Sequence, residues 1–473
     1  MLRSLLAAWT LLSCTGAQNN PAVQVILTNK GLEYGKHVGA GWVQERLQSV
    51  TFPDISGEIT LIHYTVTGTT ITKCDFPEPS VEFLQDPAGV KTSVSGLSVA
   101  LAGDWSTSLG IIHDSGSFEM AIFSLDVTSV VQLGRDGNGR LSVTSLSCDA
   151  EVGDVDIQFH GGASWIFQPF ADYFKGHIIE KIRCQTCSAV NEYISILEDH
   201  LQTMDVSFAV DQVLTLELPL TGLPVTDASN LKLGLKGEFY TKNHTEPPFV
   251  AQPFMMSEQP KFMLSLGVSE FTLNSASYSY FSAGILQAVV NDSMVFKTLH
   301  IHLNTTSMGK FIPQLPKMFP DLPMSLVVYA REAPLFSIQP GSIKVPVQAA
   351  VKALAIETNG TQVPLFKLNA DVTFSGKMWI ADGSLKGSMT LDNFTLTLVS
   401  SEVGEFKIDG LESVMRTAIK TMFLFKVNEI LGKGTMLPRM KHAQLVNSVL
   451  KMEKGFIAVS SDAEILQTER SFN

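Results

Sequence analysis

The chain has 473 residues and a formal net charge of −12. This length is too great for one hydrophobic core and predicts two or three domains. Residues 18–230 carry 10 Lys and Arg against 26 Asp and Glu, a balance of −16, whereas residues 231–473 carry 23 against 20, or +3. The acidic first half argues against nucleic acid as a partner and gives no long-range attraction to anionic membranes.

The first 17 residues have the pattern of a secretory signal peptide. Arg3 supplies the positive start, Leu5–Cys14 is a short apolar run, and small residues precede a cleavage site after Ala17. The apolar run is too short to span a bilayer as a helix, which needs roughly 20 residues. The alternative to a signal peptide is a buried first helix. The best later candidate, Val414–Val427, is interrupted by lysine and arginine. We therefore expect a secreted, extracellular protein.

Five N-glycosylation motifs agree with secretion, and all lie in the second half of the chain. They are Asn243, Asn291, Asn304, Asn359 and Asn393.

Three segments show helical periodicity. The first follows a cap at Thr28 or Asn29 and carries apolar residues up to Leu47; the second runs from about 164 to 201, and the third from 411 to 431. Most of the remainder alternates as strands do, for example over 57–70, 116–133, 139–159, 231–240 and 372–398. A linker is expected over 218–229 and the proline-rich 245–253.

A weak internal repeat indicates two related halves. The order of strand, Gly-rich turn, two strands and long amphipathic helix occurs around Asp136–Gly137 and again around Asp382–Gly383. Each half would be a highly curved sheet wrapped on a long helix. The space between helix and sheet is either a filled core or a slot for lipid chains, where each buried CH₂ contributes about 0.8 kcal/mol.

The cysteines suggest a structural disulfide. Cys74, Cys148, Cys184 and Cys187 remain after removal of the signal peptide, and secretion favours disulfides. A bridge from Cys148 to either Cys184 or Cys187 is the interpretation that the residues favour.

Motifs for enzymatic chemistry are missing from the sequence: it contains no G-x-S-x-G, H-E-x-x-H, P-loop or G-x-G-x-x-G. His300 and His302 share one face of a strand, but a metal site needs a third ligand, so they read as surface histidines. We expect no enzymatic activity, no metal and no cofactor.

Four stretches in order resemble one protein family. They are NPAVQVILTNKGLEYGKHVGAGWVQERLQSVTFPDISG (20–57), LKLGLKGEFYTKNHTEPPF (231–249), SLGVSEFTLNSASYSYFSAGIL (265–286) and LPRMKHAQLVNSVLKMEKGFIAVSSDAEI (437–465). The family contains the bactericidal/permeability-increasing, lipopolysaccharide-binding, phospholipid transfer and cholesteryl ester transfer proteins. The resemblance covers essentially the whole mature chain. KGEFYTKNH resembles the bactericidal and lipopolysaccharide-binding branch, and the chain is most similar to its bactericidal/permeability-increasing members.

The resemblance implies an α+β fold shaped as an elongated boomerang. Two barrel-like domains, each a twisted antiparallel sheet wrapped on long helices, would be joined by a central sheet. The expected parts are a signal peptide (1–17), an N-terminal lipid-binding domain (18–217), a central sheet and linker (218–253) and a C-terminal lipid-binding domain (254–473), which also returns strands to the central sheet.

Each domain is implied to hold a phospholipid in an apolar pocket. By position, the candidates for the first pocket are Leu32, Trp42, Val43, Leu47, Phe167, Phe170, Phe174 and Ile178. Those for the second are Phe271, Tyr278, Tyr280, Val414, Ala418 and Met422.

The resemblance also selects a disulfide. The family's bridge joins a cysteine on the strand before the long helix to one within that helix. Cys148 matches the first, and Cys187 matches the second better than Cys184 does.

The hairpin within 103–122 departs from the family's bactericidal pattern. In lipopolysaccharide-binding members it is rich in cations, whereas here it contains no lysine or arginine. Trp105, Leu109, Ile111 and Ile112 are instead predicted to form an apolar tip that inserts transiently into a zwitterionic membrane; the alternative is an ordinary loop.

The leading expectation is a secreted lipid-binding protein of innate immunity. It would bind lipopolysaccharide or phospholipid and act against Gram-negative bacteria, with phospholipid, lipopolysaccharide or the bacterial outer membrane as partners. The alternative is phospholipid transfer without antibacterial action. The sequence leaves open a monomer or a homodimer and storage in granules.

Overall fold

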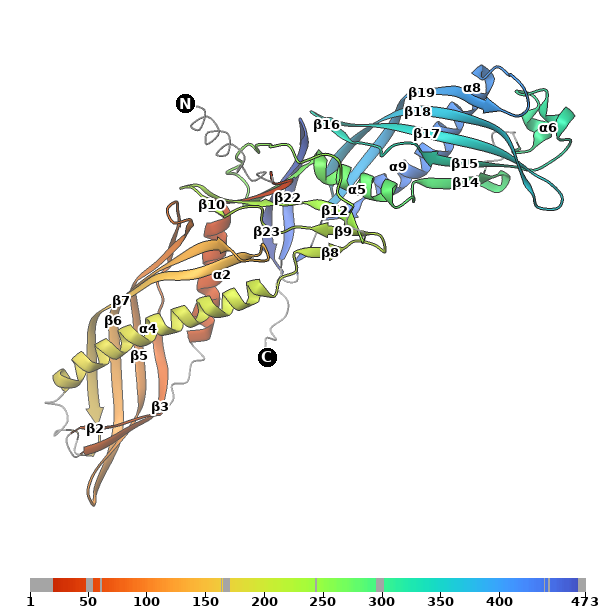
Figure 1. Ribbon diagram of the computed structural model, residues 1–473. Helices are drawn as coiled ribbons and strands as arrows, with labels where there is room; N and C mark the ends of the chain where they lie inside the picture. Colours follow the sequence, from red (N-terminus) through yellow and green to blue (C-terminus); the bar gives the residue numbers. More distant parts are fainter. Residues whose placement is uncertain are drawn as a thin grey trace, which may run out of the picture.

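The structure is a computed structural model that describes residues 20–47, 54–59, 62–162, 164, 171–242, 245–294, 302–437, 439–440 and 443–466. It is an elongated α+β molecule with two lobes (Figure 1). Each lobe is a curved antiparallel sheet accompanied by helices, and further sheets with shorter strands lie between the lobes. The predicted architecture of two barrel-like parts joined by a central sheet is therefore confirmed.

The N-terminal lobe contains long antiparallel strands in the order β2-β3-β5-β6-β7, with β4 paired to β5. They are β2 (Ile55–Ile59), β3 (Ile62–Asp75), β4 (Ser80–Leu84), β5 (Gly89–Leu109), β6 (Ile112–Arg135) and β7 (Leu141–His160). Register shifts interrupt the β3–β5, β5–β6 and β6–β7 ladders. Such bulges increase strand twist, which curls the sheet.

Two long helices accompany this sheet, α2 (Asn29–Leu47) and α4 (Ala171–Gln202). Thr28 forms the N-terminal cap of α2, because the backbone N–H of Gly31 donates to Thr28 Oγ1 at 3.4 Å. The Thr28 hydroxyl in turn donates to the carbonyl of Phe262 at 2.6 Å. The predicted cap is confirmed, and it also anchors α2 to the segment that enters the second lobe.

The central sheet collects strands from distant parts of the chain, in the order β10-β11-β1-β13-β23-β22-β21. They are β1 (Val23–Thr28), β10 (Val225–Thr226), β11 (Asn230–Leu235), β13 (Leu264–Ser269), β21 (Arg439–Met440), β22 (Ala443–Glu453) and β23 (Phe456–Ile465). A three-stranded sheet also belongs to this middle region: β8 (Ser207–Ala209), β9 (Leu214–Glu217) and β12 (Glu238–Thr241). The centre therefore pairs β1, near the start of the described residues, with β13 of the second half.

The C-terminal lobe has the strand order β14-β15-β17-β18-β19-β20, with β16 paired to β17. The strands are β14 (Gln287–Asn291), β15 (Met324–Ala330), β16 (Ser337–Gln339), β17 (Ser342–Ile356), β18 (Gln362–Ala381), β19 (Ser384–Ser401) and β20 (Thr435–Met436). Its helical segments are α5 (Glu270–Ser282), η2 (Asp292–Met294), α6 (Thr305–Met308), α7 (Leu315–Met318), α8 (Asp409–Ala418), η4 (Ile419–Phe423) and α9 (Leu424–Lys433). The third predicted helix is thus confirmed. It is one helical run over 409–433, in which η4 is a turn of π-helix between two α-helical parts.

The core of this lobe lies between the inner face of the β15–β19 sheet and helices α6, α7 and α8. Val351, Leu365, Leu368 and Phe394 are almost completely buried there. Leu411, Met415 and Ile419 supply the packing face of the helix.

The helix α5 was not predicted from the sequence. Its buried face consists mainly of small polar residues, two of which bond to β12: the Phe239 N–H donates to Ser275 Oγ at 2.9 Å, and Ser279 Oγ donates to the Phe239 carbonyl at 3.3 Å. Asn274 makes two hydrogen bonds with the backbone of Phe336, at 2.6 and 3.1 Å. Polar groups therefore connect α5 to its neighbours in the middle of the molecule.

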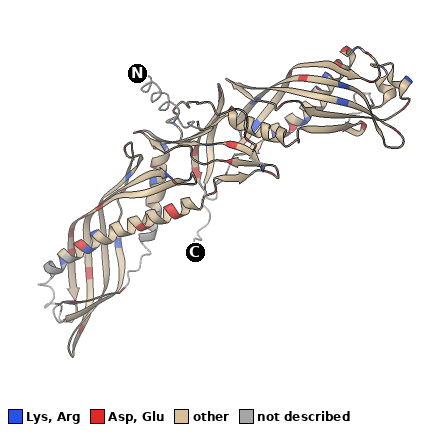
Figure 2. Ribbon diagram, viewed as in Figure 1, with Lys and Arg blue, Asp and Glu red and all other residues tan. Residues whose placement is uncertain are grey.

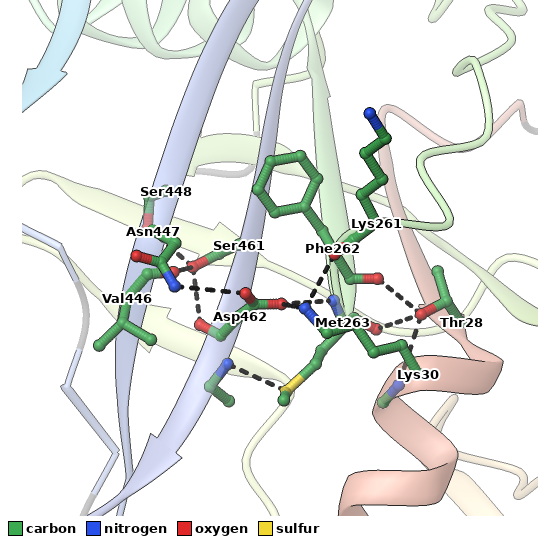
Figure 3. Close-up of polar contacts among 12 residues, drawn as sticks. Thr28, Lys30, Lys261, Phe262, Met263, Val446, Asn447, Ser448, Ser461 and Asp462 are labelled. Atoms are coloured by element: carbon green, nitrogen blue, oxygen red, sulfur yellow. Dashed lines mark hydrogen bonds and ion pairs between the residues drawn. The ribbon is translucent and has the colours of Figure 1, made fainter.

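Asp462 on β23 connects the N-terminal helix to the central sheet (Figure 3). Its carboxylate accepts hydrogen bonds from Lys30 Nζ at 2.8 Å, the Met263 N–H at 3.1 Å and Asn447 Nδ2 at 3.4 Å. Partial burial alone raises the pKa of Asp462, but the hydrogen bonds from Lys30 and Asn447 outweigh it and hold that pKa below its ordinary value.

We expect Asp462→Asn to destabilise the protein at neutral pH by about 1.5–3 kcal/mol, because hydrogen bonds to a charged group are lost. Because the folded-state pKa is lowered, the carboxylate's contribution is present above the unfolded pKa of about 3.9 and disappears as the pH falls through the folded value. Denaturant titrations of both proteins at several pH values measure this. Equal stability of wild type and variant at neutral pH would contradict it.

Candidate functional site

Helix α4 lies along the edge strand β7 of the N-terminal sheet (Figure 1). Side chains of α4 contact β7 at five levels along its length. The pairs are Lys175 with Asp154, Arg183 with the Ala150 carbonyl, Cys187 with Cys148, Asn191 with Ser145, and Glu198 with Ser142 and the Val143 N–H. The helix is therefore held at the sheet edge and leaves its other faces for the interior and the solvent.

The disulfide that the resemblance implies is present. Cys148 on β7 and Cys187 on α4 are bonded, with a Cα–Cα distance of 5.6 Å. Cys74 and Cys184 carry free thiols; Cys184 is exposed, and partial burial raises the pKa of Cys74.

One apolar stripe of α4 changes its environment along the helix. Ile178, Ile179 and Ile182 pack against the buried sheet cluster that contains Ile122 and Val155. Toward the C-terminal end of α4, Tyr193 and Leu197 continue the side of Ile179 and Ile182 at helical spacing. Their exposed fractions are 59% and 50%, so about half of each side chain is accessible to solvent.

Helix α2 is also incompletely buried. None of its described side chains is buried, although Leu32 and Val43 are partly covered. This helix contacts β1, β3 and β4, whereas α4 contacts β7. The two helices therefore lie toward opposite edges of the curved sheet. Apolar helix surface near both sides is what a slot for acyl chains requires.

The first-pocket candidates are placed only in part. Leu32, Val43 and Ile178 are partly buried, and Ile178 contacts the sheet cluster. Phe167 and Phe170, and the side chains of Trp42, Leu47 and Phe174, lie outside the described residues. Tyr193 and Leu197 were not predicted as site residues, although the apolar spacing along 164–201 already contained Leu197.

The second-pocket candidates do not form one group. Phe271 and Tyr278 both pack edge-on against Phe249, with centroids 5.9 and 6.1 Å away. Tyr280 points elsewhere, since its hydroxyl donates to Asp211 Oδ2 at 2.5 Å. Phe271 and Tyr278 thus share one aromatic cluster and Tyr280 does not belong to it. The contact of these three side chains with lipid stays a prediction.

The helical candidates of that pocket flank the core rather than face it. The positions packed on the sheet are Leu411, Met415 and Ile419, and the partly buried Val414, Ala418 and Met422 lie beside them. Their contact with lipid stays a prediction.

The hairpin between β5 and β6 ends in an exposed apolar tip. Leu109, Ile111 and Ile112 are 44%, 95% and 66% exposed, and Gly110 adopts a left-handed conformation with φ of 61° at the turn. No lysine or arginine occurs between residues 103 and 122. The predicted exposure of these three residues is confirmed, and insertion into a membrane stays a prediction.

Trp105 is not part of this tip, which corrects the prediction. It is only 4% exposed, its indole N–H donates to the Ser117 carbonyl at 3.0 Å, and its ring packs edge-on on Phe159. Gly116 lies directly opposite, and a Cβ there would stand 2.9 Å from the indole nitrogen. Because Gly116 has no side chain, the Trp105 ring can lie across the inner face of the sheet.

Two surface hollows lie away from the predicted pockets. One, of about 410 Å³, is beside the tip and is lined by His63, Thr65, Ser106–Ser108 and His113–Ser115. The other, of about 380 Å³, lies between the β18–β19 turn and β22. Neither is lined by a residue predicted to contact lipid.

Four of the five glycosylation motifs can be placed. Asn291, Asn359 and Asn393 are exposed, whereas the partly buried Asn304 caps α6 by accepting the Ser307 N–H at 2.7 Å. Asn243 lies outside the described residues, as does His300. Within the described parts, no three His, Cys, Asp or Glu side chains gather as a metal site would need, and no helix has the length and hydropathy to cross a bilayer.

Comparisons with known proteins match this arrangement over nearly its full length. The family models "LBP / BPI / CETP family, N-terminal domain" and "LBP / BPI / CETP family, C-terminal domain" match residues 31–204 and 208–465. The bactericidal permeability-increasing protein of Sebastes schlegelii is 35% identical over 452 residues, which cover 94% of this chain and 95% of that protein. The human lipopolysaccharide-binding protein is 25% identical, covering 98% of both chains.

A solved structure agrees with the sequence comparisons. A crystal structure of lipopolysaccharide binding protein, 25% identical, superposes with a TM-score of 0.59 and covers 95% of this chain and 100% of that one. The chain belongs to the LBP / BPI / CETP family.

Proposed function

We propose that this protein is a secreted lipid-binding protein of innate immunity rather than an enzyme. It would take the acyl chains of a phospholipid or of lipopolysaccharide between α4, α2 and the N-terminal sheet. The observation that carries the proposal is the apolar stripe of α4, which packs on the sheet at Ile179 and Ile182 and is half exposed at Leu197. At about 0.8 kcal/mol for each buried CH₂, one acyl chain would supply more driving force than a few hydrogen bonds.

The names of the relatives support this class of ligand. A bactericidal permeability-increasing protein and lipopolysaccharide-binding proteins match along almost the whole chain. Mass spectrometry of lipids extracted from the purified native protein tests the proposal directly. Recovery of phospholipid in a fixed molar ratio is expected, and a lipid-free protein that takes up no phospholipid from vesicles would refute it.

The choice between lipopolysaccharide and neutral phospholipid depends on the tip. The exposed tip residues carry no cation to engage lipid phosphates, which favours the second candidate function, phospholipid transfer between zwitterionic surfaces. Titration with labelled lipopolysaccharide at physiological salt distinguishes the two functions when it is compared with transfer of a self-quenched phospholipid between vesicles. Saturable lipopolysaccharide binding at micromolar protein supports the antibacterial role against Gram-negative bacteria.

Leu197→Glu is expected to lower the amount of bound phospholipid at least about tenfold, because an ionised carboxylate in an apolar slot costs several kcal/mol. Folding should be little affected, since Leu197 is half exposed. Ser195→Glu is the matched control, because it adds the same charge to an exposed position on another face of α4. Equal lipid content in all three proteins would place the lipid elsewhere.

A further inference from the structure

The outer face of the C-terminal sheet carries two lysines directly opposite each other. The register of β17 and β18 pairs Lys352 with Lys367. Their neighbours in sequence, Val351 and Leu368, are buried in the core on the inner face. Because side chains alternate along a strand, both lysines therefore point away from the core.

Neither lysine forms an ion pair with a described carboxylate. The acidic residue on the same face of β18, Asp371, is already bound by Arg331. Lys386, on β19 of the same sheet, is likewise paired with Asp382. Lys352 instead lies over the ring of Tyr329, with Nζ 5.3 Å from the centroid.

Like charges directly opposite on a sheet destabilise it, whereas a bound anion between them would remove the repulsion. Opposite Cβ atoms on paired strands are about 4.5–5.5 Å apart, so two flexible lysine side chains can reach one anion. Figure 2 shows basic residues on neighbouring strands of this sheet. The second half of the chain is also the half that is not acidic, with a balance of +3.

Hydrogen-bonding groups surround the pair. Ser400 lies opposite Lys367 on the next strand, and in the adjacent row Asn369 is paired with Thr397. Between Tyr329 and Asn369 stands Ala350, whose small side chain is fully covered by its neighbours. Lysine acts on phosphate as a point charge, and hydroxyl and amide groups complete the donors that phosphate oxygens accept.

We propose that Lys352 and Lys367, with Ser400, Asn369 and Thr397, form a binding site for a phosphate group on the outer face of the C-terminal sheet. The ligand is a phosphate-bearing molecule, either a soluble phosphate compound or an anionic lipid headgroup. The site is separate from the slot beside α4, and it does not depend on the proposed binding of acyl chains.

The experiment compares thermal unfolding of the full chain in inorganic phosphate and in chloride at equal ionic strength. The wild type is expected to unfold at a higher temperature in phosphate. Lys352→Gln and Lys367→Gln should each lose this increase. Each should also unfold at a slightly higher temperature than the wild type in low-salt chloride, because the repulsion is gone.

Lys344→Gln is the matched control. Lys344 is exposed on the same strand and points to the same face, but it pairs with Ser375 instead of another lysine. This variant should keep the phosphate response. An equal loss in Lys344→Gln, or a wild type with the same unfolding temperature in both salts, would overturn the proposal.

A second arm identifies the source of the phosphate. Binding to phosphatidylcholine vesicles is compared with and without phosphatidic acid. Binding that phosphatidic acid strengthens, and that each pair variant weakens about tenfold, supports a lipid headgroup. A phosphate response in unfolding without this vesicle effect supports a soluble phosphate compound.

Discussion

Replacing Ile111 and Ile112 together by aspartate is expected to weaken binding to phosphatidylcholine vesicles at least about 100-fold. Burying one isoleucine side chain contributes about 1.5–3 kcal/mol, and these two are the most exposed apolar residues of the tip. Because no lysine or arginine lies between 103 and 122, the wild-type interaction should hardly change with salt. Vesicle co-sedimentation at low and high salt measures both properties.

Met255→Asp provides the comparison for the tip variant. Met255 is also highly exposed, but it lies in the segment before β13 and not at the tip. This control should bind vesicles as the wild type does. If both variants bind equally well, the hairpin is an ordinary loop; if both fail, the effect comes from added charge and not from the tip.

Removing the disulfide by Cys148→Ser with Cys187→Ser is expected to lower the free energy of unfolding by about 4 kcal/mol in the chain-entropy model. The bridge closes a loop with a sequence separation of 39 residues and holds α4 against β7. Denaturant unfolding followed by the circular dichroism of the helices measures the loss.

Cys184→Ser tests whether the effect belongs to the bridge. Cys184 is an exposed free thiol on the same helix, and its replacement should change stability by less than about 0.5 kcal/mol. A similar loss in this variant, or a double variant as stable as the wild type, would contradict the role given to the bridge.

The long helices were predictable because their apolar residues repeat with helical spacing, and the first of them also begins at a capping residue. Thr28 is such a case, since its hydroxyl both caps α2 and bonds to Phe262. The helix α5 was not predictable in the same way. In SEFTLNSASYSYFS, serine and aromatic residues alternate as they do in strands, and the buried face is polar. The backbones of β12 and of the 334–336 segment supply hydrogen-bond partners for that polar face.

The site was predictable only where the direction of a side chain follows from its own element. Trp105 was assigned to the tip with its neighbours, but its direction depends on Gly116 of the next strand and on Phe159 of the strand after that. The helix of 409–433 shows a related difficulty. The π-helical turn at Ile419–Phe423 changes which residues face the sheet. After it Leu424 is buried, while Phe423 and Phe425 are exposed.

The contact between α4 and β7 has a consequence for how the protein behaves in concentrated solution. A strand of 20 residues at the margin of a sheet offers unpaired peptide groups to strands of other molecules, which promotes aggregation. Here Arg183 and Glu198 bond to the peptide groups of Ala150 and Val143, so the helix takes the place of a neighbouring strand. The Cys148–Cys187 disulfide, which holds α4 against β7, thereby also keeps β7 from pairing with a second molecule.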